Sequence, residues 1–387
     1  MLYVVLPIYW KEVGLTSLWE VGVLLSINRL VRLPLNPLIG WMYNRMSLRS
    51  GLIGAILLGT VTTLGYGVAH GFAMWLLLRI VWGIAWSLIR MGGFFTVIGF
   101  AGDSNRGHAM GRYNGLSRLG SLVGMFAGGT LVAIVGLQPV SLLFGFMSLV
   151  AFVLTLLALP HDQKVNASKP KLAFGELAVR LRSAPVMLIL AGGFIISLLF
   201  AILSATLSIV IDKKHGHTVQ LFGLAAGSTS LSGALLAAKY GWDFLLGPKI
   251  GRKSDEAKSR LPYLLASLVC SGVGYAFIPW HIPLTIWLVV VMLVMVASTA
   301  ITTLMDTVAT DVAKSSIVVA VMTAYSVVTD LGAALGPIVG LGIIEATDEP
   351  VYVYLGAAAL TGLTAIWFSR MRRVPSRENE SGRRLSG

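Results

Sequence analysis

Long apolar runs separated by short polar connections recur along the whole of this 387-residue chain. About 20 residues of α-helix span the hydrocarbon core of a bilayer, where every backbone polar group needs a partner within the protein. The strands of a membrane barrel would be about 10 residues long with alternating polarity, whereas these runs are longer and apolar on all sides. Only 12% of the residues are charged, against about 25% in a soluble domain. The sequence therefore predicts an all-α polytopic membrane protein.

The same arrangement of residues occurs twice in the chain. At an offset of 211 residues, Asn28, Arg32, Pro37, Gly40 and Asn44 coincide with Lys239, Asp243, Pro248, Gly251 and Asp255. At an offset of 212 residues, Tyr113, Arg118, Gly120, Gly124 and Gly128 coincide with Tyr325, Asp330, Gly332, Gly336 and Gly340. Two separate blocks that share one period predict two copies of a single membrane unit. Glycines spaced by four residues would let the helices of each copy pack closely.

The apolar runs predict six helices on either side of one long polar connection. The first half covers residues 1–160 and the second covers 186–370. The connection, 161–185, alternates apolar and basic positions over 172–182, which favours a helix lying at the membrane interface. The basic, serine-rich tail, 371–387, is expected to be disordered.

The first apolar run differs from the others in its length. Residues 1–10 are too few to cross a bilayer, so we expect them to be the outer end of a truncated first helix that begins upstream. The other predicted spans are 19–43, 51–69, 73–100, 109–136, 138–160, 186–211, 218–247, 261–279, 283–310, 315–343 and 350–369. Together they make twelve helices in a 6+6 arrangement.

The basic residues are distributed unevenly between the two sides of this predicted bundle. Most of the 30 Lys and Arg residues lie in the tail and on alternate connections, beginning with Arg45. The opposite connections carry only Lys11, Lys213 and Lys214. Basic connections face the cytoplasm, so the C-terminus is predicted to be cytoplasmic in a cell membrane. The net charge of +13 then reflects topology and interaction with the bilayer, and it does not indicate a nucleic-acid partner.

Ionisable residues also lie inside the predicted spans, where they are expensive unless they face a cavity or a partner. The first half carries Arg29, Arg32, Arg79, Arg90 and Arg118, and the second half carries Lys239, Asp243, Asp306 and Asp330. Five cations without nearby acids predict either partners in the other half or an anionic substrate. We therefore interpret Arg79, Arg90 and Arg29 as candidate substrate-binding residues.

Each of these interpretations has a plainer alternative. Arg79 is near the outer end of its span, so its charge could reach the polar interface. Arg29 could pair within the first half. Lys239 and Asp243 are four residues apart, so they could form an ion pair along one helix face. Asp306 could be a protonation site, because burial raises the pKa of a carboxyl group, or it could be an outward-facing cap.

Several motifs carry a resemblance to a known family. Gly40-x-x-x-Asn44-Arg45, with Gly251-x-x-x-Asp255 in the second copy, is similar to the loop between helices 2 and 3 of the major facilitator superfamily. Asn44 replaces the family's acid. The run from Gly120 to Gly129 resembles its antiporter motif, although Met125 replaces the usual proline. The resemblance covers nearly the whole chain.

This resemblance implies a bundle of two pseudo-symmetric halves that transports by alternating access. It assigns gating between the halves to Gly40, Asn44, Arg45, Gly251 and Asp255. It also implies an exporter driven by inward proton flow, for which we interpret Asp306 as the proton-coupling residue. The departure at Met125 puts the direction of transport in question.

The repeat also predicts two gate pairs. In the family fold helix 2 faces helix 11, and helix 5 faces helix 8. Arg32 would then lie opposite Asp330, and Arg118 would lie opposite Asp243. We expect both pairs to close the cytoplasmic side when the cavity opens outward. In the alternative, Lys239 holds Asp243, and water or lipid headgroups satisfy the other charges.

Taken together, these features predict a secondary transporter of a small anionic or zwitterionic metabolite or drug. The sequence contains no nucleotide-binding loop, metal-ligand cluster or nucleophile–base pair, so we expect no enzyme activity, cofactor or metal. We expect the protein to act as a monomer. The alternatives are an importer of organic anions with the same fold and a non-transporting scaffold or receptor.

Overall fold

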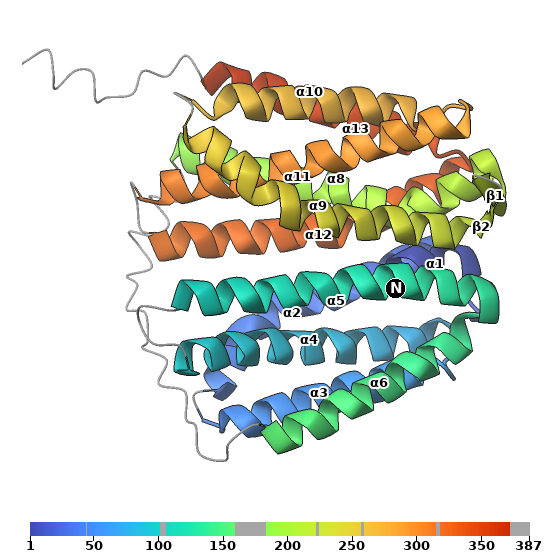
Figure 1. The fold of residues 1–387 in the computed structure, drawn as a ribbon, viewed down its shortest axis with the longest axis vertical. Helices are drawn as coiled ribbons and strands as arrows, with labels where there is room; N and C mark the ends of the chain where they lie inside the picture. The colour runs from blue at the N-terminus through green and yellow to red at the C-terminus, as the bar shows by residue number, and fades with distance from the viewer. Residues whose placement is uncertain are drawn as a thin grey trace, which may run out of the picture.

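The computed structural model describes residues 1–43, 45–100, 106–158, 183–221, 224–256, 259–314 and 318–371, which form twelve helices and one small β-hairpin. Figure 1 shows the helices lying side by side in one bundle, with the helices of the first half in blue to green and those of the second half in lime to red. The predicted helical membrane fold with two halves is confirmed.

The helix bounds follow the predicted spans in both halves, apart from the span 218–247. The first half contains α1 (Leu2–Tyr9), α2 (Leu18–Tyr43), α3 (Leu48–Gly65), α4 (Phe72–Phe100), α5 (Arg106–Val135) and α6 (Leu137–Ala158). The second half contains α8 (Ala184–His215), β1 (Thr218–Leu221), β2 (Leu224–Gly227), α9 (Ser228–Asp255), α10 (Leu261–Phe277), α11 (Leu284–Lys314), α12 (Val318–Thr347) and α13 (Val351–Met371). The predicted linker, 161–185, with its interfacial helix at 172–182, and the predicted disordered tail, 371–387, lie almost wholly outside the described residues.

Eight helices of the described part are long and apolar enough to cross a membrane: α3, α4, α5, α6, α8, α11, α12 and α13. The apolar α10 is slightly shorter. The two other long helices are α2, which carries Arg29 and Arg32 in its interior, and α9, which carries Lys239 and Asp243. Their lower hydropathy therefore marks the helices whose polar side chains face protein rather than lipid.

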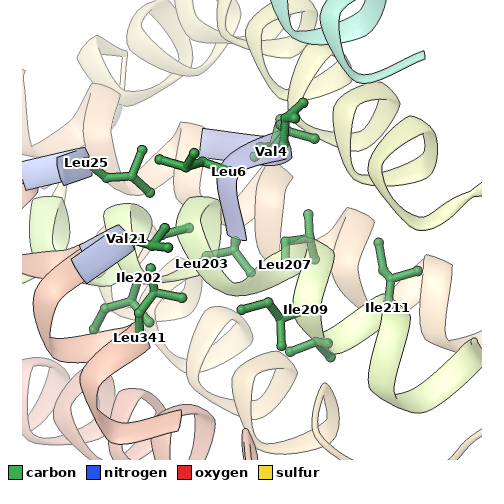
Figure 2. Close-up of a cluster of buried hydrophobic side chains, with 14 of the residues drawn as sticks. Val4, Leu6, Val21, Leu25, Ile202, Leu203, Leu207, Ile209, Ile211 and Leu341 are labelled. Carbon is green, nitrogen blue, oxygen red and sulfur yellow. The ribbon is translucent and has the colours of Figure 1, made fainter. Parts of the chain in front are cut away.

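The two ends of the bundle differ in charge and in packing. We call the end with β1 and β2 the hairpin end, and the end with Arg45, Arg252 and Arg370 the basic end (Figure 1). At the hairpin end one apolar cluster joins both halves (Figure 2). It combines Val4 and Leu6 of α1, Val21 and Leu25 of α2, Leu203 and Leu207 of α8, and Leu341 of α12. Because these side chains are buried, the hairpin end is closed between the halves.

Two long helix pairs form most of the contact between the halves, as the family resemblance implies: α2 packs on α12, the eleventh of the predicted helices, and α5 packs on α9, the eighth, while α1 also contacts α8. We call these contacts the α2–α12 seam and the α5–α9 seam. Glycine is needed where backbones approach most closely at the hairpin end. A Cβ atom at Gly22 would lie 2.9 Å from the Pro337 carbonyl oxygen, and one at Gly129 would lie 2.7 Å from the Thr229 carbonyl oxygen.

The structure corrects the predicted span 218–247 at its beginning. Residues Thr218–Leu221 and Leu224–Gly227 form an antiparallel hairpin, with Thr218 opposite Gly227. Gly216, with φ of 91°, ends α8, and the Ser228 amide then donates to the His217 carbonyl oxygen at 2.9 Å. The sequence did not reveal the hairpin, because residues 218–227 are mostly apolar and a short apolar run is consistent with either a helix or strands.

Candidate functional site

The α2–α12 seam contains a shared carboxylate. Arg32 Nη2 lies 3.1 Å from Asp330 Oδ1, and Arg29 Nη1 lies 3.4 Å from the same oxygen. The Arg32 and Asp330 side chains are 7% and 18% exposed. Arg29 also donates from Nε to the Tyr3 hydroxyl of α1 at 3.3 Å. The structure therefore brings Arg32 and Asp330 together across the halves, while their role as a gate stays a prediction.

Arg90 adds a third guanidinium to this region. It lies on α4 with its guanidinium carbon 5.7 Å from the centre of the Phe94 ring, and its charge acts on Arg32. Among the described residues Arg90 has no carboxylate within ion-pair distance, and Arg32 Nε has no acceptor. Arg29 and Arg32 thus share the carboxylate of Asp330, and Arg90 adds a third positive charge nearby, which leaves an excess of positive charge between the halves.

The α5–α9 seam holds its acid in a different way. Lys239 Nζ donates to Asp243 Oδ2 at 2.7 Å, and Thr299 Oγ1 of α11 donates to Asp243 Oδ1 at 2.7 Å. The Lys239 ammonium also lies 4.3 Å from the centre of the Phe200 ring. Both carboxylate oxygens of Asp243 are therefore occupied by partners from its own half.

The expected contact between Arg118 and Asp243 is consequently absent in this conformation. Arg118 is exposed on α5 and forms no ion pair with any described residue. The physical reason is distance along the chain: Lys239 stands one helical turn from Asp243 and reaches it without any movement of the halves. The alternative in which Lys239 holds Asp243 describes this arrangement.

A cavity of about 680 Å³ lies in the α5–α9 seam. Its walls are apolar except for a few side chains, and they include Arg112, Leu116, Arg118, Leu119, Tyr240 and Phe244. This volume is in the range of pockets that hold small organic ligands. The cavity lies on the part of the seam toward the basic end, whereas Gly129 and Thr229 close the seam toward the hairpin end.

Asp306 is an exposed carboxylate on α11, and its Oδ1 accepts a hydrogen bond from the Tyr325 hydroxyl of α12 at 3.0 Å. The charges of Arg118 and Lys239 both act on it. Asp306 lies eight residues before the end of α11 at Lys314, so it does not cap this helix. Its interpretation as the proton-coupling residue remains a prediction.

Arg79 does not lie at the open part of the molecule. Its side chain is buried, with Nε donating to the Leu24 carbonyl oxygen at 2.7 Å and Nη2 donating to the Leu25 carbonyl oxygen at 3.4 Å. Both acceptors belong to the backbone of α2. Arg79 therefore neither reaches the polar interface nor faces the α5–α9 cavity, and the geometry fits a residue that positions α2.

The loop-motif residues lie at the basic end. Gly40 is in α2 and Gly251 is in α9, and a Cβ atom at either position would make only ordinary contacts, at 3.7 Å to Met91 and 3.9 Å to Thr303. Arg45 lies with its guanidinium carbon 4.0 Å from the centre of the Trp41 ring. Asn44 lies outside the described residues. Asp255 is the last residue of α9, and its side chain also lies outside them.

Three partners of the charged residues were not found from the sequence. Tyr3 and Thr299 come from helices that are distant in sequence from their partners, and no pattern marks them. Tyr325 had a signal, because it is equivalent to Tyr113 in the repeat. Tyr113 packs against Phe94, with ring centres 5.6 Å apart, and Phe94 precedes Asp306 by the same 212 residues.

Comparison with known proteins agrees with this architecture. A family model described as the Major Facilitator Superfamily matches residues 1–254 and 240–386. The chain is 24% identical over 384 residues to the multidrug resistance protein MdtG of Escherichia fergusonii, covering 96% of this chain and 90% of that protein. It is 27% identical over 235 residues to the chromaffin granule amine transporter of Rattus norvegicus, covering 60% of this chain and 44% of that protein.

A solved structure shares the fold at low sequence identity. It is a crystal structure of a bacterial homolog to the human lysosomal transporter Spinster, in an inward-facing and unoccupied conformation. The TM-score is 0.69 at 16% identity, and the match covers 97% of this chain and 94% of that chain. At this identity the likeness concerns the fold.

Proposed function

This chain belongs to the Major Facilitator Superfamily and is a multi-pass membrane transporter rather than an enzyme, and from this premise we propose that it exports a small organic anion or zwitterion in exchange for protons. The substrate would bind between the two halves, and access would alternate as one half rocks against the other. The basic end would face the cytoplasm, because basic connections prefer that side.

One observation carries the proposal: positive charge exceeds negative charge between the halves. The cations there are Arg29, Arg32, Arg90, Arg118 and Lys239, and the carboxylates among the described residues are Asp243, Asp306 and Asp330. Charges in a membrane interior are expensive without partners. An anionic group on the substrate would balance the excess and would be recognised by it.

The same region supports exchange with protons. Asp306 is exposed and hydrogen-bonded to Tyr325, and Asp330 is shared by two guanidiniums. A carboxylate that gains a proton loses its charge, so it would no longer hold the ammonium group of a zwitterionic substrate. Proton and substrate would therefore occupy the site in alternation, while the arginines bind the acidic group of the substrate.

Inverted membrane vesicles test this proposal, because the cytoplasmic face of the protein is then outside. An acidic lumen should drive uptake of labelled organic acids, and a protonophore should abolish that uptake. Asp330→Asn should remove it, whereas Arg370→Gln, on the exposed end of α13, should transport normally at equal expression.

Three results separate the candidate functions. Uptake driven by the acidic lumen supports export. Loss of preloaded substrate under the same gradient would identify an importer of organic anions. Equal movement of every tested anion in vesicles with and without the protein would contradict transport of anions and leave a scaffold or receptor.

A further inference from the structure

The two seams are equivalent in the repeat, but in the α5–α9 seam an arginine that has no ion pair among the described residues lines a cavity. In the α2–α12 seam Asp330 meets Arg32. In the α5–α9 seam the equivalent positions are Arg118 and Asp243, and Asp243 is held by Lys239 and Thr299. Arg118 is left without an ion-pair partner among the described residues and lines the 680 Å³ cavity.

A single substitution between the repeats explains this difference. Lys239 occupies the position that Asn28 occupies in the first copy. Asn28 is neutral and cannot neutralise the charge one turn away at Arg32, so Arg32 pairs across the seam. Lys239 neutralises Asp243 along its own helix, which frees Arg118 for another anion.

The walls of the cavity indicate what that anion carries. Leu116, Leu119 and Phe244 line it, and their side chains remain 69%, 54% and 63% exposed. Arg112 and Arg118 stand in the same wall on α5. Six residues separate them, about 9 Å along the helix axis, so both guanidiniums border the same cavity from one helix. Apolar surface next to paired cations is complementary to an apolar chain with an acidic head.

We infer that the α5–α9 seam is a binding site for a single-chain anionic amphiphile that enters from the bilayer, with its acidic head on Arg118 and Arg112 and its chain along Leu116, Leu119 and Phe244. This inference rests on the proposed function and names the substrate class of the same transporter. Lys239 is a positioning residue, because it acts by keeping Asp243 away from Arg118.

Arginine suits the head of such a molecule, since its guanidinium presents a planar set of donors that matches carboxylate or phosphate oxygens. The exposed apolar wall suits the chain, because a pocket open to lipid lets the chain remain in an apolar environment throughout entry. Bilayer entry also requires no opening at the hairpin end, where the apolar cluster joins the halves.

Saturable binding of radiolabelled dodecanoate to the full-length protein in phosphatidylcholine nanodiscs tests the inference at pH 8. Empty nanodiscs give the background. Butanoate, which has the same head and a short chain, should compete at least tenfold more weakly than unlabelled dodecanoate. Dodecyltrimethylammonium, which has the same chain and a cationic head, should also compete at least tenfold more weakly.

Variants assign the site within the protein. Arg118→Gln should weaken dodecanoate binding at least tenfold, and Arg118→Lys should retain most of it. Lys239→Gln should weaken binding as well, because Asp243 then becomes available to Arg118, and Lys239→Arg should restore it. Arg252→Gln, at the basic end of α9 but outside the cavity wall, is the matched control and should bind normally.

Each result decides between the site and the function. Equal competition by butanoate would overturn the amphiphile site while leaving transport of small anions intact. Equal competition by the cationic amphiphile, or normal binding by Arg118→Gln, would overturn the headgroup assignment. Dodecanoate binding without gradient-driven uptake of any anion in inverted vesicles would support the site and contradict the proposed function.

Discussion

The α2–α12 seam and the α5–α9 seam arise from one repeated sequence, yet they hold their charges in opposite ways. The first seam places Asp330 within 3.4 Å of both Arg29 and Arg32, so its acid joins the two halves. The second seam places Asp243 within 2.7 Å of Lys239, so its acid stays within one half. Pseudo-symmetry of the backbone therefore does not require symmetry of the charge pairs, and one side chain decides which partner an acid takes.

The two glycine faces have different surroundings. A Cβ atom at Gly332 would lie 2.2 Å from the Phe194 carbonyl oxygen of α8, so α12 packs tightly there. Its equivalent on α5, Gly120, has no described neighbour within 4 Å, and neither has Gly124. Gly128, beside Met1, is where that face meets a neighbour.

The largest expected effect comes from breaking the α2–α12 seam by charge reversal. Arg32→Asp would place two carboxylates together in a poorly solvated site, and breaking a buried pair costs about 3–5 kcal/mol. We expect transport to fall below detection in inverted vesicles at equal expression. Adding Asp330→Arg should restore part of the activity because it recreates the pair with reversed polarity. No recovery in the double variant would contradict a role for this pair in the transport cycle.

The second prediction removes the feature that distinguishes the α5–α9 seam. Lys239→Met leaves Asp243 with Thr299 alone, and we expect a loss of about 3 kcal/mol of stability, as for other buried pairs. Thermal unfolding in detergent measures this loss. The double variant with Asp243→Leu should recover most of it, since replacing both charges by apolar groups is often neutral. An unchanged melting temperature for Lys239→Met would mean that the pair contributes little.

The third prediction compares the two ends of α5. Gly129→Ala places a Cβ atom 2.7 Å from the Thr229 carbonyl oxygen, and overpacking of this kind costs about 1–3 kcal/mol. Gly124→Ala is the matched control, because no described atom lies within 4 Å of its Cβ position. Melting temperatures of the two variants test whether the α5–α9 seam is closed at the hairpin end and open elsewhere. Equal destabilisation by both would argue against that description.

The smallest effect is expected for an exposed pair, which provides a reference for the buried ones. Lys213 donates to Asp348 in the connection between α12 and α13, and this hydrogen bond, together with the lysine charge, lowers the pKa of Asp348. A lowered pKa stabilises the fold above the ordinary value of about 3.9, and that stabilisation is lost as the pH falls through the folded-state pKa.

Asp348→Asn should therefore lower the melting temperature slightly at pH 7 and leave it unchanged near pH 2 relative to the original protein. Asparagine is suitable because residue 348 has φ of 55°, a conformation that asparagine tolerates. A larger effect at low pH than at neutral pH would contradict the assigned direction of the pKa shift.

The pairing of Arg32 with Asp330 could be predicted because it depends only on the repeat period and on which helices face each other. Both residues lie eight positions or more from a helix end, so small errors in the predicted bounds do not change their depth. The position of Arg79 could not be predicted in the same way. Its acceptors are backbone carbonyl oxygens of Leu24 and Leu25, and any span offers such acceptors.

The amino-acid sequence by itself determined the helical membrane fold, the two halves and the location of the charged residues along each helix. These follow from hydropathy and periodicity, which act on every residue of a span. The tertiary structure alone decided that Asp243 pairs with Lys239 rather than Arg118, that residues 218–227 form a hairpin, and that a cavity opens beside Arg118. Each of these outcomes depends on distances between side chains or segments, and only the folded protein fixes those distances.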